Sequence, residues 1–294
     1  MNNRRKTHGM QVAWTLAKRE WIRFFRQPFR VIAALGQPIL FWLLFGTGFH
    51  QAFRGGNAGE SFMGYYIAGT VALILLFTAI FSTISIIEDR KEGFLQGVLV
   101  APAPRWAIAV GKSLGGAAIA LAQALLFVCL ALAVGMLPIG WHLIPLVGFL
   151  AICALAITGM GVCFAWPMES TQGYHAAMNM VMLPMWMLSG AFFPIPAGTD
   201  GLPTGQKVMQ FLMQCNPMSY MVAGIRHFSG VIPPLSIGPR SNDPINSNLV
   251  NGNMVVQGWI PSVQSSCIWT IAFAVFTFCL STLLVRRRQR GEFA

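Results

Sequence analysis

The sequence predicts an all-α integral membrane protein with six transmembrane helices. Of its 294 residues, 55% are hydrophobic and only 10% are charged, and the mean hydropathy is +0.60. Soluble domains carry about 25% charged residues, so this composition indicates a membrane protein. Six apolar runs are also long enough to cross a bilayer, which takes about 20 helical residues.

An amphipathic helix in the membrane interface is expected first, over residues 11–30. Its two helical stripes are aromatic or apolar (Trp14, Ala17, Trp21, Phe25) and basic (Arg19, Arg23, Arg26, Arg30). The pattern is typical of a helix with its rings toward the acyl chains and its guanidinium groups among lipid headgroups. A solvated basic helix is the alternative, which the tryptophans and phenylalanines disfavour. Pro28 marks the break before the first span.

The transmembrane spans follow in the order 31–49, 62–87, 107–137, 142–166, 172–197 and 263–285. Most of the 20 lysines and arginines fall before the first span, between spans two and three, and after span six. Those segments share one side of a six-span topology, and such basic segments are retained in the cytoplasm. We therefore expect both termini to be cytoplasmic, in a bacterial cytoplasmic (inner) membrane. Residues 198–261 would then form an extended outer loop containing two short apolar pieces.

Few residues offer catalytic or ligand chemistry. The five histidines show no metal-ligand spacing and no nucleophile is paired with a base, so we expect neither an enzyme nor a metal site. No ionisable residue lies in the core of a span, which disfavours an ion-coupled carrier. The basic residues are divided among three flanks, which disfavours nucleic-acid binding. Cys215 and Cys267 could both face outward and pair, and His175 with Asn179 could form a gate or a packing pair.

The segment between spans two and three, EDRKEGFLQGVLVAPAPRWAIAVGKS, ends in the last residues of a phosphate-binding loop motif. The first glycine of that motif would have to be residue 106, which is Trp106, and a membrane span follows where an α/β domain is needed. We therefore expect no nucleotide site. Residues 88–104 instead predict a short helix parallel to the membrane, charged at its start, which can dock into a groove on a partner. The spacing of Gly111 and Gly115 permits close helix approach.

Three stretches resemble the ABC-2 type permeases, the membrane subunits of ATP-binding-cassette exporters. Residues 88–112 resemble the first cytoplasmic loop of that family, with a charged run, a Glu-Gly pair, a leucine-rich stretch, a proline and a Gly-Lys in this order. LSGAFFPIP (188–196) resembles the end of the fifth span, and NPMSYMVAGIR (216–226) resembles the pattern before the sixth. Gln96-Gly97 stands where the family often has Glu-Arg. The likeness covers nearly the whole chain as one transmembrane domain, 1–294.

The resemblance implies a dimer of permeases, each engaged by a soluble ATPase subunit that holds ATP and Mg, while this chain binds no cofactor. Residues 88–104 would be the coupling helix. The residues expected to couple are Glu88, Asp89, Arg90, Glu92, Gly93, Phe94, Leu95, Leu99 and Pro102. Weaker candidates for a substrate path at the permease interface are Gln37, Phe41, Phe45, Met185, Trp186, Ser189, Phe192 and Phe193.

The expected function is export of a hydrophobic or amphipathic substrate, such as a drug, lipid or natural product. Apolar, aromatic and methionine-rich spans favour such a molecule over a glycan. A permease for a polysaccharide or lipid-linked glycan is the alternative within the same class. A membrane assembly or binding protein without a transport cycle is the alternative of another class, and it predicts no ATPase partner.

Overall fold

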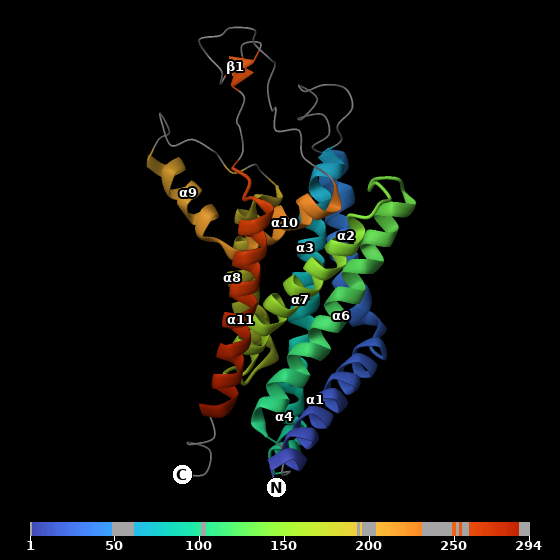
Figure 1. The fold of residues 1–294 in the computed structure, drawn as a ribbon, viewed down its shortest axis with the longest axis vertical. Coiled ribbons are helices and arrows are strands. Elements are labelled where there is room, and N and C mark those ends of the chain that lie inside the picture. The colour runs from blue at the N-terminus through green and yellow to red at the C-terminus, as the bar shows by residue number, and fades with distance from the viewer. Residues whose placement is uncertain are drawn as a thin grey trace.

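The computed structural model is a helical bundle that is elongated along one axis (Figure 1). It describes residues 2–48, 62–100, 104–192, 195, 204–230, 249–250, 253–254 and 259–287. The helices are α1 (Asn2–Phe25), α2 (Pro28–Gly48), α3 (Phe62–Thr83), α4 (Ser85–Lys91), α5 (Phe94–Val100), α6 (Arg105–Ala133), α7 (Leu143–Ala165), α8 (Thr171–Trp186), η1 (Met187–Ala191, a π-helical turn), α9 (Thr204–Cys215), α10 (Pro217–Ser229) and α11 (Val263–Arg287). Two short strands, β1 (Leu249–Val250) and β2 (Asn253–Met254), pair in antiparallel fashion.

Five helices are long and apolar enough to cross a membrane: α2, α3 running on through α4, α6, α7 and α11. The chain is therefore a multi-pass helical protein by length and composition. The predicted fifth span falls on α8 and η1, where a 16-residue α-helix passes into a π-helical turn. Because that segment is interrupted, the six-span topology stays a prediction. The start of α1 and the end of α11 lie at the same end of the bundle as α4 (Figure 1).

Helix α3 forms the centre of the bundle. Within its apolar stretch 94% of the residues are buried, against 22% for α2 and for α11. Helices α2, α6, α7, α8 and α10 all pack against it. A helix that is hydrophobic all round is stable only when other helices or lipid surround it, and here neighbouring helices surround α3. The outward faces of α2 and α11 are left to lipid or to another chain.

Helix α1 packs along α6, and glycines allow the contact. A Cβ atom on Gly111 would lie 2.7 Å from the carbonyl oxygen of Ala13, and one on Gly115 would lie 2.9 Å from the Cβ of Glu20. No larger residue fits without moving the backbone of α1. The predicted close approach at these glycines is confirmed, and the partner is α1.

The aromatic stripe of α1 faces outward as predicted, but the basic stripe does not. Trp14 and Trp21 point outward, with 71% and 39% of their surface exposed, as a helix in the membrane interface requires. Arg26 is also exposed. Arg19 and Arg23, however, turn toward carboxylates of α4, so the prediction that they lie among lipid headgroups is wrong. The paired acidic groups stabilise them inside the protein.

The predicted single helix over 88–104 is wrong, because the structure has two short helices there. Helix α4 continues the span of α3 as far as Lys91, and the chain then turns at Gly93. Gly93 has a φ of 75°, the left-handed conformation that favours glycine at the end of a helix. Helix α5 starts at the next residue. Pro102 lies outside the described residues.

The segment predicted as an outer loop contains α9 and α10, at the positions of its two apolar pieces. The sequence around α10 explains its bounds. The side chain of Asn216 accepts a hydrogen bond from the backbone N–H of Met218 at 3.0 Å, Pro217 opens the helix, and Gly230 closes it with a φ of 71°. Cys215 and Cys267 do not pair, since all six cysteines are free thiols.

Candidate functional site

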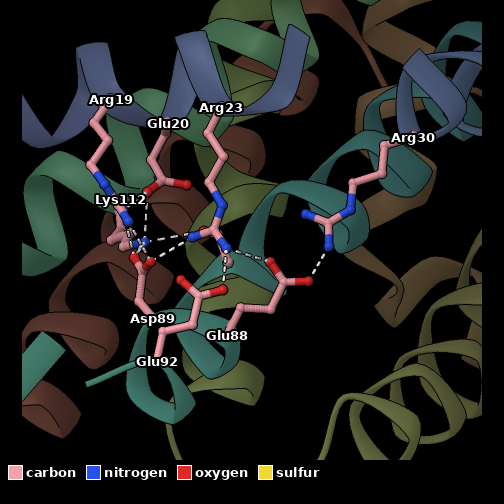
Figure 2. A network of polar contacts seen from close by, with 9 residues as sticks. Arg19, Glu20, Arg23, Arg30, Glu88, Asp89, Glu92 and Lys112 are labelled. Carbon is pink, nitrogen blue, oxygen red and sulfur yellow. Dashed lines mark hydrogen bonds and ion pairs between the residues drawn. The ribbon is translucent and has the colours of Figure 1, made fainter. Parts of the chain in front are cut away.

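Four basic and four acidic side chains meet at the end of the bundle that holds α4 (Figure 2). They come from α1, the start of α2, the region of α4 and the N-terminal part of α6. We call this set the charge network: Arg19, Arg23, Arg30, Lys112, Glu20, Glu88, Asp89 and Glu92. The formal charges cancel, and each of the eight ions lies within salt-bridge distance of an ion of opposite sign, as buried charges require.

Asp89 lies at the centre of the charge network and is fully buried. Its two carboxylate oxygens accept a bidentate pair of hydrogen bonds from Arg19, both at 2.8 Å. Arg23 donates at 2.5 Å, and the Lys112 ammonium also donates to this carboxylate. Bidentate, charge-assisted pairs of this kind are strong and fix geometry. The hydrogen bond to Asp89 raises the pKa of Arg19 above its ordinary value, although burial acts in the opposite direction.

Lys112 joins α6 to both α1 and α4. Its ammonium donates to Glu20 at 2.6 Å and to the hydroxyl of Ser85 at 3.1 Å, in addition to Asp89. All three of its donors are therefore used within the protein. The Gly-Lys-Ser of residues 111–113 has a structural explanation, because Gly111 makes room for α1 and Lys112 completes the charge network.

The remaining ion pairs extend the charge network toward α2 and toward the turn after α4. Glu88 accepts from Arg23 at 3.0 Å and also from Arg30. Glu92 accepts from Arg23 at 3.2 Å, and 59% of its side-chain surface is exposed. Burial thus decreases from Asp89 to Glu92, along the direction in which the chain leaves the bundle.

Helix α5 is held in two ways. The guanidinium of Arg19 lies over the ring of Phe94, 3.7 Å from its centre, which is a cation–π contact. Leu95 is 3% exposed and packs into the core of the bundle. Of these two residues of the predicted docking face, Phe94 is partly exposed and Leu95 faces inward. The side chain of Leu99 lies outside the described residues.

Arg90 connects α4 to the end of α7. It donates to the carbonyl oxygens of Trp166 at 2.7 Å and Met168 at 3.1 Å, and it lies 5.3 Å from the centre of the Trp166 ring. The α4 segment is thereby fixed on one side by α1 and α6 and on the other by the chain between α7 and α8. A displacement of α4 would act on all of these elements.

The sequence prediction singled out Glu88, Asp89 and Glu92 but missed Glu20 and Lys112, and it assigned the arginines to lipid headgroups. The signal was present, since Arg19 and Arg23 are four residues apart on a helix and so project from one face toward any nearby acidic run. Partners about 70 positions away cannot be chosen from that spacing alone. The predicted coupling residues Glu88, Asp89 and Glu92 do lie together.

The four aromatic candidates that the structure describes, Phe41, Phe45, Trp186 and Phe192, form a cluster at the other end of the bundle. Phe45 lies 5.0 Å and Trp186 4.8 Å from the ring of Phe192, measured between centroids. Trp186 and Ser189 are buried, while Phe41 and Met185 are partly buried. Gln37 is exposed on α2, and Phe193 lies outside the described residues. The cluster therefore packs within one chain, and Gln37 faces away from the protein interior.

The described residues form neither a metal centre nor the predicted pair of His175 and Asn179. No group of three or more His, Cys, Asp or Glu side chains there could hold a metal ion. His175 packs against the ring of Phe81 at 5.8 Å between centroids, and Asn179 is exposed on the same helix. The two are therefore not a buried polar pair.

Comparison with known proteins gives relatives along most of the chain. The ycf38 transport permease of Cyanophora paradoxa is 26% identical over 220 residues, which are 74% of this chain and 73% of the relative. Nodulation protein J of Rhizobium leguminosarum bv. viciae is 27% identical over 272 residues, covering 88% and 87%. The "probable multidrug ABC transporter permease YbhR" of Escherichia coli K12 is 22% identical over 221 residues, which are 75% of this chain but only 54% of that protein.

The family profile described as "ABC-2 type transporter" matches residues 11–228. This range takes in α1 from residue 11 onward, the whole charge network, and α10 as far as Phe228. It also contains the three stretches that carry the resemblance seen in the sequence. The chain is a multi-pass transport permease, and it belongs to the ABC-2 type transporter family.

Proposed function

We propose that this chain is the permease subunit of an ATP-driven exporter in a bacterial cytoplasmic membrane. A separate soluble ATPase subunit would bind ATP and Mg and dock on the turn between α4 and α5. The end of the bundle with the charge network would face the cytoplasm, together with both termini. Membership of the ABC-2 family supports pairing with an ABC ATPase. The observation that carries the proposal is the charge network around α4.

The charge network supplies a physical route for coupling. If α4 moved alone, the buried carboxylate of Asp89 would lose its cations, and breaking a buried ion pair costs about 3–5 kcal/mol. Moving α1, α6 and α4 together avoids that cost. Force applied to the α4–α5 turn would then displace whole helices, and Arg90 would extend the displacement to the chain before α8.

Burial divides the predicted coupling residues into two roles. Glu92 and Phe94 are exposed enough for a docked partner to touch, and Gly93 shapes the turn between them. Asp89 is fully buried, so it would act by holding α4 in position. Glu88 and Arg90 are partly buried and would share that positioning role.

A second copy of the permease would cover the faces of α2 and α8. Gln37 on α2 and Asn179 on α8 are exposed, and within the proposed spans lipid would not hydrogen-bond their amide groups. Polar side chains in membrane helices usually face other helices or a water-filled path. A homodimer with the substrate path between the copies would satisfy both amides. Lipids would contact the remaining apolar faces.

The substrate we propose is a hydrophobic or amphipathic molecule. Phe41 is partly buried behind the exposed face of α2, and Met180 and Met187 are exposed on α8 and η1. Flexible methionine and aromatic side chains suit apolar surfaces of variable shape. One relative carries the word multidrug in its name. A polysaccharide or lipid-linked glycan is the alternative substrate, and parallel export assays would distinguish the two.

The test is to replace residues at the α4–α5 turn in the permease reconstituted with its ATPase. We expect Glu92→Lys to uncouple ATP hydrolysis from transport, because it reverses the charge at the docking site and repels Arg23. We expect the same of Gly93→Pro, because proline cannot adopt a φ of 75°. ATPase rate and substrate export are measured in the same vesicles.

Lys207→Glu is the matched control, since it changes the charge of an exposed residue on α9, away from the charge network. It should leave both rates unchanged. Normal coupled transport by Glu92→Lys and Gly93→Pro with an intact ATPase would refute the coupling assignment. Failure of the unmodified permease to stimulate any ATPase would favour a membrane assembly protein without a transport cycle.

A further inference from the structure

The end of α8 far from the charge network is broken. The π-helical turn η1 follows α8, and within it Gly190 has a φ of 75°, outside the helical region. Pro184, near the end of α8, has no N–H to donate. Such a break exposes backbone carbonyl groups, and inside a membrane protein other groups must satisfy them.

Two side chains of α10 and its cap satisfy carbonyl groups of this segment. Asn216 Nδ2 donates to Met185 O at 2.5 Å, and Arg226 Nη2 donates to Gly190 O at 2.6 Å. The single hydroxyl proton of Ser219 is used by Met213 O at 2.6 Å, while Leu188 O lies 3.4 Å away. Asn216 and Arg226 belong to the NPMSYMVAGIR stretch, whose polar residues therefore have a shared structural task.

The hydrogen bond from Arg226 to the Gly190 carbonyl is the strongest of these contacts. Arg226 is only 7% exposed, and its guanidinium lies 4.1 Å from the centre of the Tyr65 ring. The hydroxyl of Tyr65 donates to the same Gly190 carbonyl at 3.0 Å. One carbonyl thus receives a charged and a neutral donor from two different helices. A charged donor makes this hydrogen bond stronger than an ordinary one.

The turn is also pressed against α3. Trp186 donates from its indole N–H to the carbonyl oxygen of Gly69 at 2.8 Å. A Cβ on Gly69 would lie 2.8 Å from the Cβ of Ala191, so the two backbones are in close contact. Ala191 is completely buried as a result.

We propose that Asn216 and Arg226, together with Tyr65 of α3, form a latch that holds η1 against α10 and α3, and that each transport cycle releases it. Side-chain bonds to η1 can break without unwinding α10 or α3, so the turn is free to leave as a unit. The other end of α8 begins just after the chain that Arg90 holds. Motion of α4 therefore has a connected path to the latch. This inference rests on the proposed transport function.

The latch can be tested by labelling a buried position. In a background in which the six cysteines are replaced, Ala191→Cys reports opening through its reaction with a membrane-impermeant maleimide. A second variant that retains only Cys215, exposed at the end of α9, reports general accessibility. At rest we expect Ala191→Cys to react far more slowly than Cys215. Arg226→Gln should raise its rate about tenfold, as expected for loss of one charge-assisted hydrogen bond, and Arg226→Lys should restore part of the protection.

Tyr65→Phe provides a second test that keeps the ring and removes only one donor, should Arg226→Gln fail to fold. It should raise the rate by a smaller factor. Unchanged labelling of Ala191→Cys in folded Arg226→Gln and Tyr65→Phe would overturn the latch, and so would continued protection during measured ATP-driven export. Absence of export by the parent protein would instead overturn the proposed function, since resting protection and its loss in Arg226→Gln need no ATPase.

Discussion

Lys112 occupies a place where shape and charge are both restricted. Helix α1 passes so close to α6 that a Cβ at Gly111 or Gly115, the glycines on either side of Lys112, would clash with α1. An ammonium group is a compact charge with three donors, and here those donors reach three acceptors at once. A planar guanidinium is larger and presents its donors in a fixed fork. The identity of this residue, and not only its charge, is therefore set by the packing.

Replacement of Lys112 by methionine should destabilise the protein by about 3 kcal/mol, because Glu20 would lose its closest cation while it remains buried. The measurement is the unfolding midpoint of the detergent-solubilised protein, and Lys112→Arg should recover only part of the loss. Lys18→Met, at an exposed position of α1, is the control and should leave the midpoint unchanged. Equal midpoints for the two methionine variants would show that Lys112 does not stabilise the charge network.

At the scale of elements, the sequence predicted the long apolar helices well and their contacts poorly. The third and fourth runs, 107–137 and 142–166, agree closely with α6 and α7, because hydropathy over about 20 residues reports burial in lipid or protein alike. The division of 88–104 at Gly93 was missed, although a glycine after a charged helical turn is an ordinary helix end. The ion pairs between α1 and α4 form because the fold brings these two helices together, and no local sequence pattern predicts which distant helices will meet.

The close contact between α1 and α6 predicts that a larger side chain at a glycine of this contact lowers the stability of the protein. Gly111→Val should lower the unfolding midpoint by the equivalent of about 1–3 kcal/mol, because it places atoms against the backbone of Ala13. Proteolysis within α1 should become faster, since the helix would separate from the bundle. Gly148→Val is the matched control, because nothing lies within 4 Å of a Cβ there. If both variants unfold alike, the close contact does not limit stability.

At the scale of the whole molecule, the two ends of the bundle differ in how they are held. The end with α4 is fixed by ion pairs among four helical segments, while the other end is fixed by aromatic rings and side-chain bonds to carbonyls. Ion pairs in the first set are mutually dependent, so that end moves as one body. Bonds in the second set are separable, which suits a part that must open.

The proposed dimer predicts which face of the molecule meets its copy. In a cysteine-free background, Gln37→Cys should form cross-links between two copies in native membranes, because α2 would lie at the interface. Val275→Cys, 57% exposed on α11, should form none, because that face would contact lipid. The products are separated by mass under non-reducing conditions. Cross-linking through α11 but not through α2 would place the interface on the opposite face.

The order of residues in the charge network has a consequence for synthesis of the protein. During translation the arginines of α1 and α2 emerge first, and the carboxylates around α4 follow at the end of the most deeply buried helix. Lys112 arrives last and supplies the cation for Glu20. The carboxylates around α4 thus find their arginines already present, so the acidic end of α4 need not wait unpaired for the rest of the chain to be inserted.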